Sequence, residues 1–215
     1  MRLLITAGPT REYLDDIRFI SNASSGQMGY AIAKAAARAG HTVDLVSGPV
    51  ALPKPPGVRL VRVVSTQEMY RASAELFPKA DCLIGAAAPV DWRPARRRQG
   101  KMKKSQKVRT IEVKPTVDIL ARLGRRKKKK QVIFAFALEV KDPVANALAK
   151  LQRKNADAIV LNSPEALGAQ KSSIQVLFDS GDSIEMRKTS KLRIARLLVS
   201  LAETLHARKC AGKTD

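Results

Sequence analysis

The sequence has few cysteines, histidines and aromatic residues, and each shortage argues against a class of protein. Of its 215 residues, two are cysteines (Cys82 and Cys210) and two are histidines (His41 and His206). Two cysteines provide no disulfide framework, and the isolated histidines lack the cysteine partners of a zinc site. Aromatic residues make up 4% of the chain, which is too few for the base-stacking platforms of a nucleic-acid-binding domain.

The sequence also lacks a run of about eighteen apolar residues, so no transmembrane helix is predicted. Residues 1–8 are too short an apolar stretch for a signal peptide and lead directly into a glycine turn. The apolar fraction of 45% is sufficient for a core, and the length suits one compact domain. We therefore expect a single cytoplasmic domain over residues 1–215 that has no membrane partner.

Acidic residues are scarce relative to basic ones. Forty lysines and arginines against nineteen aspartates and glutamates give a formal charge of +21. Such a charge attracts polyanions, including nucleic acids and phosphorylated small molecules. Much of the excess lies in residues 96–98, 101–104 and 125–130. We interpret the last block as a solvated loop between two elements.

Apolar runs alternate with helical patterns, which favours a Rossmann-like, doubly wound α/β fold: a mostly parallel sheet with helices on both faces. Strands are expected at residues 2–7, 42–47, 59–64, 81–86, 131–137 and 158–162. A small β-hairpin extension is expected at about residues 173–188 and an amphipathic C-terminal helix at about 191–208. Segment 89–114 is polar, basic and too long for an ordinary connection, so it is predicted to be a lid-like loop.

A first candidate site follows the first strand. Gly8 begins a turn there, but the helical pattern begins only after Ser24, Ser25 and Gly26. A helix N-terminus exposes unpaired N–H groups, and glycines beside it allow close approach, so this is a potential anion site. The alternative is an ordinary capped helix start, because Ser24 and Gln27 also fit a capping box.

A second candidate site lies at the end of the strand expected at residues 81–86. Gly85, Ala86 and Ala87 are small enough for a flat base or ribose to lie against the backbone, and Asp91 offers hydrogen-bond acceptors. The alternative is a tight strand end with a capped turn. Lys101 follows on the long loop, and a flexible lysine is suited to neutralising the charge of a triphosphate.

Taken in order, these motifs resemble bacterial phosphopantothenoylcysteine synthetase, also called phosphopantothenate–cysteine ligase. The likeness runs from residue 3 to about 162 and is carried by the motifs at residues 8–12, 18–29, 46–49, 91–94 and 101–104. The resemblance implies a homodimer that uses CTP and Mg²⁺ in coenzyme A biosynthesis. The carboxylate of 4′-phosphopantothenate would form an acyl-cytidylate and release pyrophosphate, and the amine of cysteine would then displace CMP.

The resemblance also implies roles for individual residues. Asn22 would hold the substrate carboxylate with Arg18 nearby, and Lys101 would contact the phosphates, so Asn22 and Lys101 are the predicted catalytic residues. The other predicted nucleotide contacts match positions of the family's nucleotide site: Ser24, Gly26, Gly85, Ala86, Ala87, Asp91, Val117, Asp118, Ile119, Leu120, Phe136, Lys150 and Lys154. The ligands of the metal stay unassigned. Because Met1 begins the first strand of the synthetase, we expect a free-standing form without a fused decarboxylase.

Two other classes of protein fit parts of the sequence. The β-α-β opening is also typical of an NAD(P)-dependent Rossmann-type reductase, but here the glycines come about twenty residues later than in the dinucleotide fingerprint. The net charge would suit a basic nucleic-acid-binding protein, but no recognition module is visible. We therefore expect small-molecule substrates and no specific nucleic-acid partner.

Overall fold

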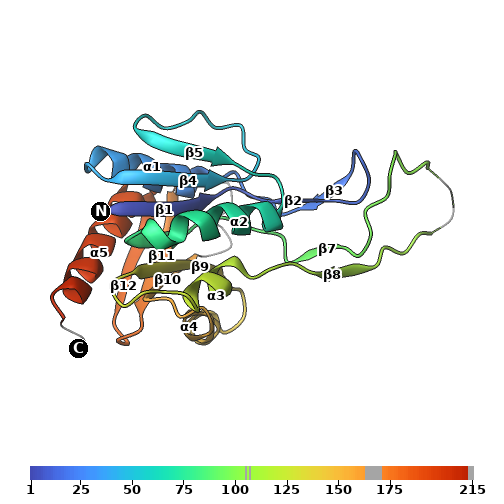
Figure 1. Cartoon of the computed structure of the whole chain (residues 1–215). Helices are drawn as coiled ribbons and strands as arrows, with labels where there is room; N and C mark the ends of the chain where they lie inside the picture. Colours follow the sequence, from blue (N-terminus) through green and yellow to red (C-terminus); the bar gives the residue numbers. More distant parts are fainter. Residues whose placement is uncertain (105, 107, 163–170, 213–215) are drawn as a thin grey trace.

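The computed structural model describes residues 1–104, 106, 108–162 and 171–212. Its centre is an eight-stranded sheet with the order β12-β11-β10-β9-β6-β1-β4-β5. The strands are β1 (Arg2–Ala7), β4 (Thr42–Ser47), β5 (Val58–Arg62), β6 (Cys82–Gly85), β9 (Val132–Leu138), β10 (Ala158–Asn162), β11 (Lys171–Phe178) and β12 (Ser183–Ser190). Six neighbouring strands of this sheet are parallel: β10, β9, β6, β1, β4 and β5. Beyond β10, β11 and β12 extend the edge of the sheet as an antiparallel hairpin. The predicted doubly wound fold is confirmed (Figure 1).

Helices cover both faces of the sheet, and the sheet is buried on both sides as its apolar strands require. On one face pack α1 (Gln27–Arg38) and α5 (Lys191–Cys210), and on the other α2 (Thr66–Leu76), α3 (Ile119–Gly124) and α4 (Pro143–Arg153). A short 3₁₀ helix, Phe77–Lys79, follows α2. Within the described part of the chain, no helix combines the length and apolarity needed to cross a membrane.

The starts of two helices test the capping signals in the sequence. Ser65 caps α2, and its side chain accepts a hydrogen bond from the Glu68 N–H, as the capping-box pattern requires. The start of α1 is different, because its N-cap is Gly26 at φ 73°, with no side-chain cap. The alternative interpretation of Ser24 and Gln27 as a capping box is therefore wrong.

Two short antiparallel ribbons project from the carboxyl edge of the parallel strands (Figure 1). One pairs β2 (Arg11–Tyr13) with β3 (Phe19–Ser21), and the other pairs β7 (Trp92–Pro94) with β8 (Val113–Pro115). None of these strands was predicted, because three residues are too few to show alternation. The predicted loop 89–114 thus begins and ends as a ribbon, and Ser105 and Lys107 within it lie outside the described residues.

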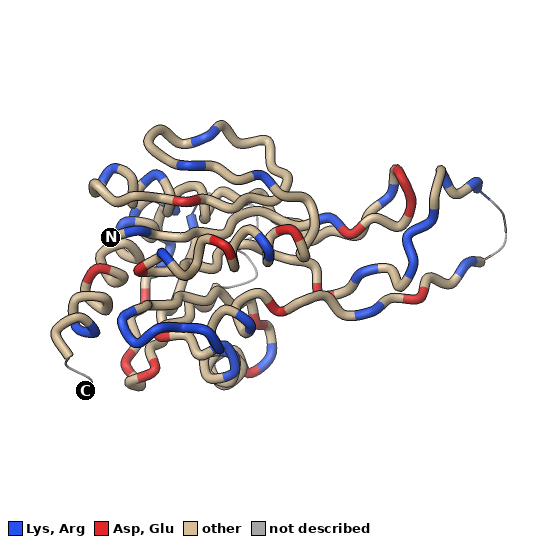
Figure 2. The backbone as a smooth tube through the Cα atoms, viewed as in Figure 1, with Lys and Arg blue, Asp and Glu red and all other residues tan. Residues whose placement is uncertain are grey.

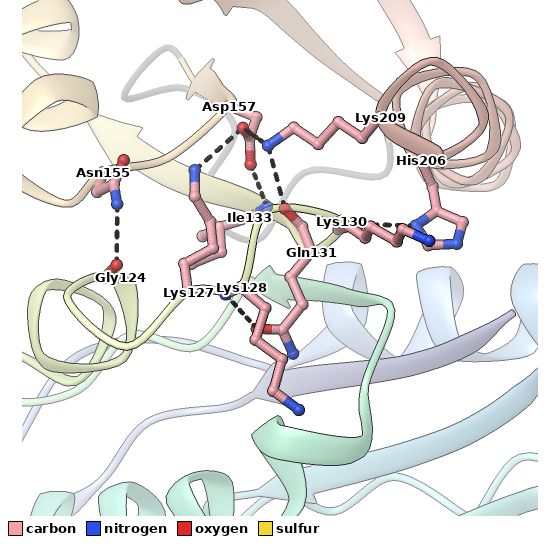
Figure 3. Close-up of polar contacts among 10 residues, drawn as sticks. All are labelled: Gly124, Lys127, Lys128, Lys130, Gln131, Ile133, Asn155, Asp157, His206 and Lys209. Carbon is pink, nitrogen blue, oxygen red and sulfur yellow. Dashed lines mark hydrogen bonds and ion pairs between the residues drawn. The ribbon is translucent and has the colours of Figure 1, made fainter. Parts of the chain in front are cut away.

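The basic run 125–130 lies at the opposite end of the sheet (Figure 2). There, Lys127 Nζ and Lys209 Nζ both contact Asp157 Oδ1, at 3.0 and 2.5 Å, while Asp157 Oδ2 accepts from the Ile133 N–H at 2.7 Å (Figure 3). The side chain of Lys127 is only 11% exposed. The interpretation of this run as a solvated loop is therefore wrong for Lys127, although its other five residues are exposed.

Candidate functional site

The candidate site lies where the order of the strands reverses direction. β1 pairs with β4 on one side and with β6 on the other, so the chain winds outward from β1 in both directions. In doubly wound sheets, ligands bind in the crevice at the carboxyl ends of the strands at this point. An isolated bridge between Pro9 and Ala88 continues the pairing beyond β1 and β6 and brings the two following loops together.

A pocket of about 360 Å³ opens at the end of β6. Most of the predicted nucleotide contacts line it: Gly85, Ala87, Asp91, Val117, Asp118, Ile119, Leu120, Phe136, Lys150 and Lys154. Ala86 lies between two of these residues, and its N–H donates to the Thr6 carbonyl at 3.2 Å. The structure thus brings together residues from β6, the loop after it, α3, β9 and α4.

The close packing of α3 explains why β6 ends in a glycine. A Cβ atom at Gly85 would lie 2.6 Å from Leu120 Cδ1, well inside van der Waals contact. Leu120 and Gly85 both line the pocket, so a side chain at Gly85 would fill space where a ligand can lie.

The lysines of the pocket are paired with carboxylates. Lys154 Nζ donates to both oxygens of Asp118, at 2.8 and 2.9 Å, and Lys150 Nζ lies 2.5 Å from Glu139 Oε1. Asp118 also caps α3 by accepting from the Ala121 N–H at 3.0 Å. Burial raises the pKa of Asp118, but the hydrogen bonds from Lys154 and Ala121 outweigh it and leave the pKa below its ordinary value. Asp118 is therefore ionised at neutral pH.

The N-terminus of α1 forms a second part of the site. Gly8 and Gly26 both have positive φ, and a Cβ atom at Gly26 would lie 3.3 Å from Gly8 Cα. Glycines at both positions therefore let the helix start approach the turn after β1. The Ser24 hydroxyl accepts from the Gly26 N–H at 3.4 Å.

Asn22 connects the two parts. Its exposed side chain donates from Nδ2 to the carbonyls of Pro89 (2.9 Å) and Ala88 (3.4 Å). Pro89 lines the pocket, so the loop before α1 reaches the pocket wall through this amide.

Arg18 and Lys101 are not among the residues that line the pocket. Arg18 Nη1 donates to Asp15 Oδ2 and to the Met102 carbonyl, both at 2.8 Å. Arg18 therefore joins the β2–β3 loop to the segment after β7, and Lys101 directly precedes Met102 in that segment. That segment 89–114 closes over a ligand stays a prediction.

Two contacts of the site were missed by sequence reasoning. Glu139, which pairs with Lys150, directly follows β9, and a carboxylate at a strand end is a usable signal. Asp15 gave no such signal, because its partner Met102 is distant in the sequence.

Comparison with known proteins supplies the family. The family model for the DNA/pantothenate metabolism flavoprotein C-terminal domain matches residues 1–205. The chain belongs to this family. The Coenzyme A biosynthesis bifunctional protein CoaBC of Bacillus subtilis (strain 168) is 41% identical over 198 residues, which cover 90% of this chain and 48% of that protein. The crystal structure of the C-terminal domain of CoaBC is 39% identical, with a TM-score of 0.81 over 96% of both chains.

A further relative carries a different activity in its name. A cysteine/cysteine sulfinic acid decarboxylase from an unknown prokaryotic organism is 48% identical over 169 residues, covering 78% of this chain and 47% of that protein. The chain thus spans about half the length of the curated relatives it matches. The likeness to the synthetase domain that the motifs indicated is confirmed at the level of the family.

Proposed function

We propose that this chain is a phosphopantothenate–cysteine ligase that activates its acid substrate with CTP. The carboxylate of 4′-phosphopantothenate attacks the α-phosphorus of CTP, giving an acyl-cytidylate and pyrophosphate. The amine of cysteine then attacks the acyl carbon, forming an amide and expelling CMP. The observation that carries the proposal is the pocket at the strand-order reversal, which in a member of this family is lined by most of the predicted nucleotide contacts.

The charges of the pocket suit the base and ribose of the nucleotide rather than its phosphates. The lining holds three cations and two carboxylates, and a third carboxylate pairs with one of the cations: Lys150, Arg153, Lys154, Asp91, Asp118 and Glu139. These charges balance, so little positive charge is left for a triphosphate. Phe136 is partly buried in the lining and offers an apolar surface to the base.

The phosphates therefore need donors beyond the pocket. The first N–H groups of α1 are unpaired within the helix and lie beside the turn after β1, which is a favourable place for an anion. Lys101 adds a mobile positive charge, which would stabilise the charge that develops on the phosphates during transfer.

Asn22 lies between the pocket and the N-terminus of α1, where the carboxylate of the substrate would meet the α-phosphate of CTP. Its amide would orient the carboxylate and then hold the acyl-cytidylate until cysteine arrives. Arg18 uses Nη1 for Asp15 and Met102, and its side chain is 41% exposed, so its other N–H groups can contact the anionic substrate.

Mg²⁺ belongs to the proposal as a partner of the triphosphate. Mg²⁺ commonly keeps several waters and takes one or two carboxylates together with substrate phosphates. Asp91 fits this role, because it lies near the point where the chain leaves the pocket lining for the segment that carries Lys101, is exposed and has no side-chain partner within the described residues. Those residues contain no preformed group of three His, Cys, Asp or Glu, so the phosphates would supply most of the binding. Bound there, the ion would neutralise phosphate charge.

The proposal extends to a cytoplasmic homodimer. Relatives of this chain are named as coenzyme A biosynthesis proteins, which fits the cytoplasm. The hairpin leaves β12 at the edge of the sheet, where a strand can pair with a second chain.

An assay with omitted components tests the reaction. With CTP, Mg²⁺, 4′-phosphopantothenate and cysteine, the protein is expected to release equal amounts of pyrophosphate and CMP. Without cysteine, pyrophosphate is expected only up to the amount of enzyme, and ATP in place of CTP tests the choice of nucleotide. Folded protein that releases no pyrophosphate with any nucleotide would contradict the proposal, as would CO₂ release from cysteine as the only activity.

A further inference from the structure

Asp15 is a buried carboxylate that the proposed reaction does not use. It lies in the short loop between β2 and β3, and its side chain is fully buried although the neighbouring Asp16 and Ile17 are exposed. Burying a charged group is costly unless hydrogen bonds compensate for the lost water. The hydrogen bonds of Asp15 therefore show which parts of the chain this buried carboxylate holds in place.

The two oxygens of Asp15 have separate partners. Oδ1 accepts from the N–H groups of Ile17 (2.8 Å) and Arg18 (2.7 Å), which shapes the loop itself. Oδ2 accepts from the Met102 N–H (3.0 Å) and from Arg18 Nη1 (2.8 Å), and the same Nη1 donates to the Met102 carbonyl (2.8 Å). Backbone N–H groups of Arg18 and Met102 hold the pKa of Asp15 far below its ordinary value. The carboxylate is thus ionised at neutral pH.

The backbone on the other side of Lys101 is held as well. The Gly100 N–H donates to Asp16 Oδ2 at 2.7 Å, and the Arg98 N–H donates to the Leu14 carbonyl at 2.9 Å. Lys101 thus lies between two anchored residues, Gly100 and Met102, while its own side chain is exposed. Within the described residues, that side chain has no partner.

We propose that Asp15 is a positioning residue that presents Lys101 to the phosphates of the nucleotide. This inference rests on the proposed function, because Lys101 is assigned there to the phosphates. A lysine on an anchored backbone keeps a mobile ammonium group but loses less conformational entropy when the phosphates bind. We call the hydrogen bonds that hold Met102 the clamp: its N–H donates to Asp15 Oδ2, and its carbonyl accepts from Arg18 Nη1, which also donates to Asp15 Oδ2.

Asp15→Asn tests the roles of the two carboxylate oxygens separately, because it keeps one oxygen and replaces the other by an NH₂ group. The amide oxygen still accepts from the loop N–H groups of Ile17 and Arg18. The new NH₂ group, however, faces two donors, the Met102 N–H and the Arg18 guanidinium, so the clamp on Met102 is lost while the loop keeps its shape. We expect pyrophosphate release to slow about 10- to 100-fold, since misplacement of a catalytic group costs about 10²-fold. Asp182→Asn, an exposed carboxylate in the β11–β12 turn, is the matched control, and its rate should stay within twofold of wild type.

A double variant shows whether Asp15 acts through Lys101. If it does, Asp15→Asn should add almost nothing in a Lys101→Gln background, because the group being positioned is already absent. A residue that only supports the fold would instead slow the Lys101→Gln enzyme by its full factor. Full additivity of the two losses would therefore overturn the inference.

Limited digestion with trypsin tests the clamp without any activity. The Lys101–Met102 bond contains the N–H that Asp15 holds, so in wild type it should be cut at least tenfold more slowly than the Lys103–Lys104 bond. In Asp15→Asn the two bonds should be cut at similar rates. This digestion result would support the clamp whether or not the chain releases pyrophosphate. A failure to release pyrophosphate would overturn the proposed reaction but not the clamp.

If Asp15→Asn does not fold, amide hydrogen exchange on the unmodified chain tests whether the backbone on both sides of Lys101 is held. The Met102 and Gly100 amides should exchange at least tenfold more slowly than those of Lys103 and Lys104. Exchange of the Met102 amide at the rate of an unprotected peptide would overturn the inference.

Discussion

Replacing Asp157 by asparagine should remove the charge that two lysines share at the amino ends of the parallel strands. Asp157 is 2% exposed, and Lys127 and Lys209 both contact its Oδ1. An asparagine has nearly the same shape and keeps an acceptor for the Ile133 N–H. The perturbation is therefore mainly the loss of one negative charge between two positive ones (Figure 3).

The exposure of the two lysines determines how much Asp157→Asn is expected to lower the free energy of unfolding. Removing one partner of a buried ion pair costs about 3–5 kcal/mol, because the other charge is left without compensation. Lys127 is 11% exposed, but Lys209 is 24% exposed and sits in the last turn of α5, where it can turn towards water. We therefore expect a loss of about 2–4 kcal/mol in the free energy of unfolding. For a chain of this length, that lowers Tm by about 5–15 °C.

Thermal and urea unfolding of four proteins provide the test: wild type, Asp157→Asn, the double variant Asp157→Asn with Lys127→Met, and Asp179→Asn. The double variant should be more stable than Asp157→Asn alone, because it removes one of the uncompensated charges. Asp179→Asn, at an exposed site that lines the same surface pocket as Asp157 and Lys209, should change stability by less than about 0.5 kcal/mol. A loss below about 1 kcal/mol for Asp157→Asn, or an equal loss for Asp179→Asn, would refute the reasoning.

Four further predictions concern the site and the assembly. Lys101→Gln should slow pyrophosphate release by about 10²-fold or more, as loss of one charge-stabilising donor does, whereas Lys114→Gln at the base of the ribbon should change it less than threefold. Asn22→Asp should abolish turnover with little change in Tm, because it places a negative charge against the substrate carboxylate. Gly85→Ala should weaken CTP binding by about tenfold in calorimetric titration, since its Cβ would lie 2.6 Å from Leu120 Cδ1 in the pocket lining. Light scattering should report about twice 23.5 kDa, and an active monomer would contradict the dimer.

Much of the fold was predictable because the parallel strands are continuous apolar runs between glycine and proline signals. β1, β4 and β10 have the predicted bounds, since each run is short and ends at a polar or turn residue. The candidate pocket was predictable only in part from local patterns: the small residues at the end of β6 and the following Asp91 stand out in the sequence, whereas residues 117–120, Phe136, Lys150 and Lys154 were predicted through the family resemblance. The motif at Gly85 could be placed on the structure once β6 was located.

The contacts that sequence reasoning missed join residues that are distant in the chain. Asp15 and Met102 are 87 residues apart, and neither position shows in sequence that they are bonded. Lys127 looks like any lysine of a basic run until α5 and Asp157 pack against it. The ribbon strands are too short to carry a period, so only their pairing defines them. Local patterns cannot show such tertiary contacts.

The central claim, activation of a carboxylate by CTP, is tested most directly by the fate of a carboxylate oxygen. The protein would be given 4′-phosphopantothenate labelled with ¹⁸O in its carboxylate, together with CTP, Mg²⁺ and cysteine. If the acyl-cytidylate forms, one labelled oxygen must leave with CMP when cysteine attacks the acyl carbon, and mass spectrometry should find CMP heavier by one ¹⁸O. CMP without the label, or the label in pyrophosphate or phosphate, would contradict the account.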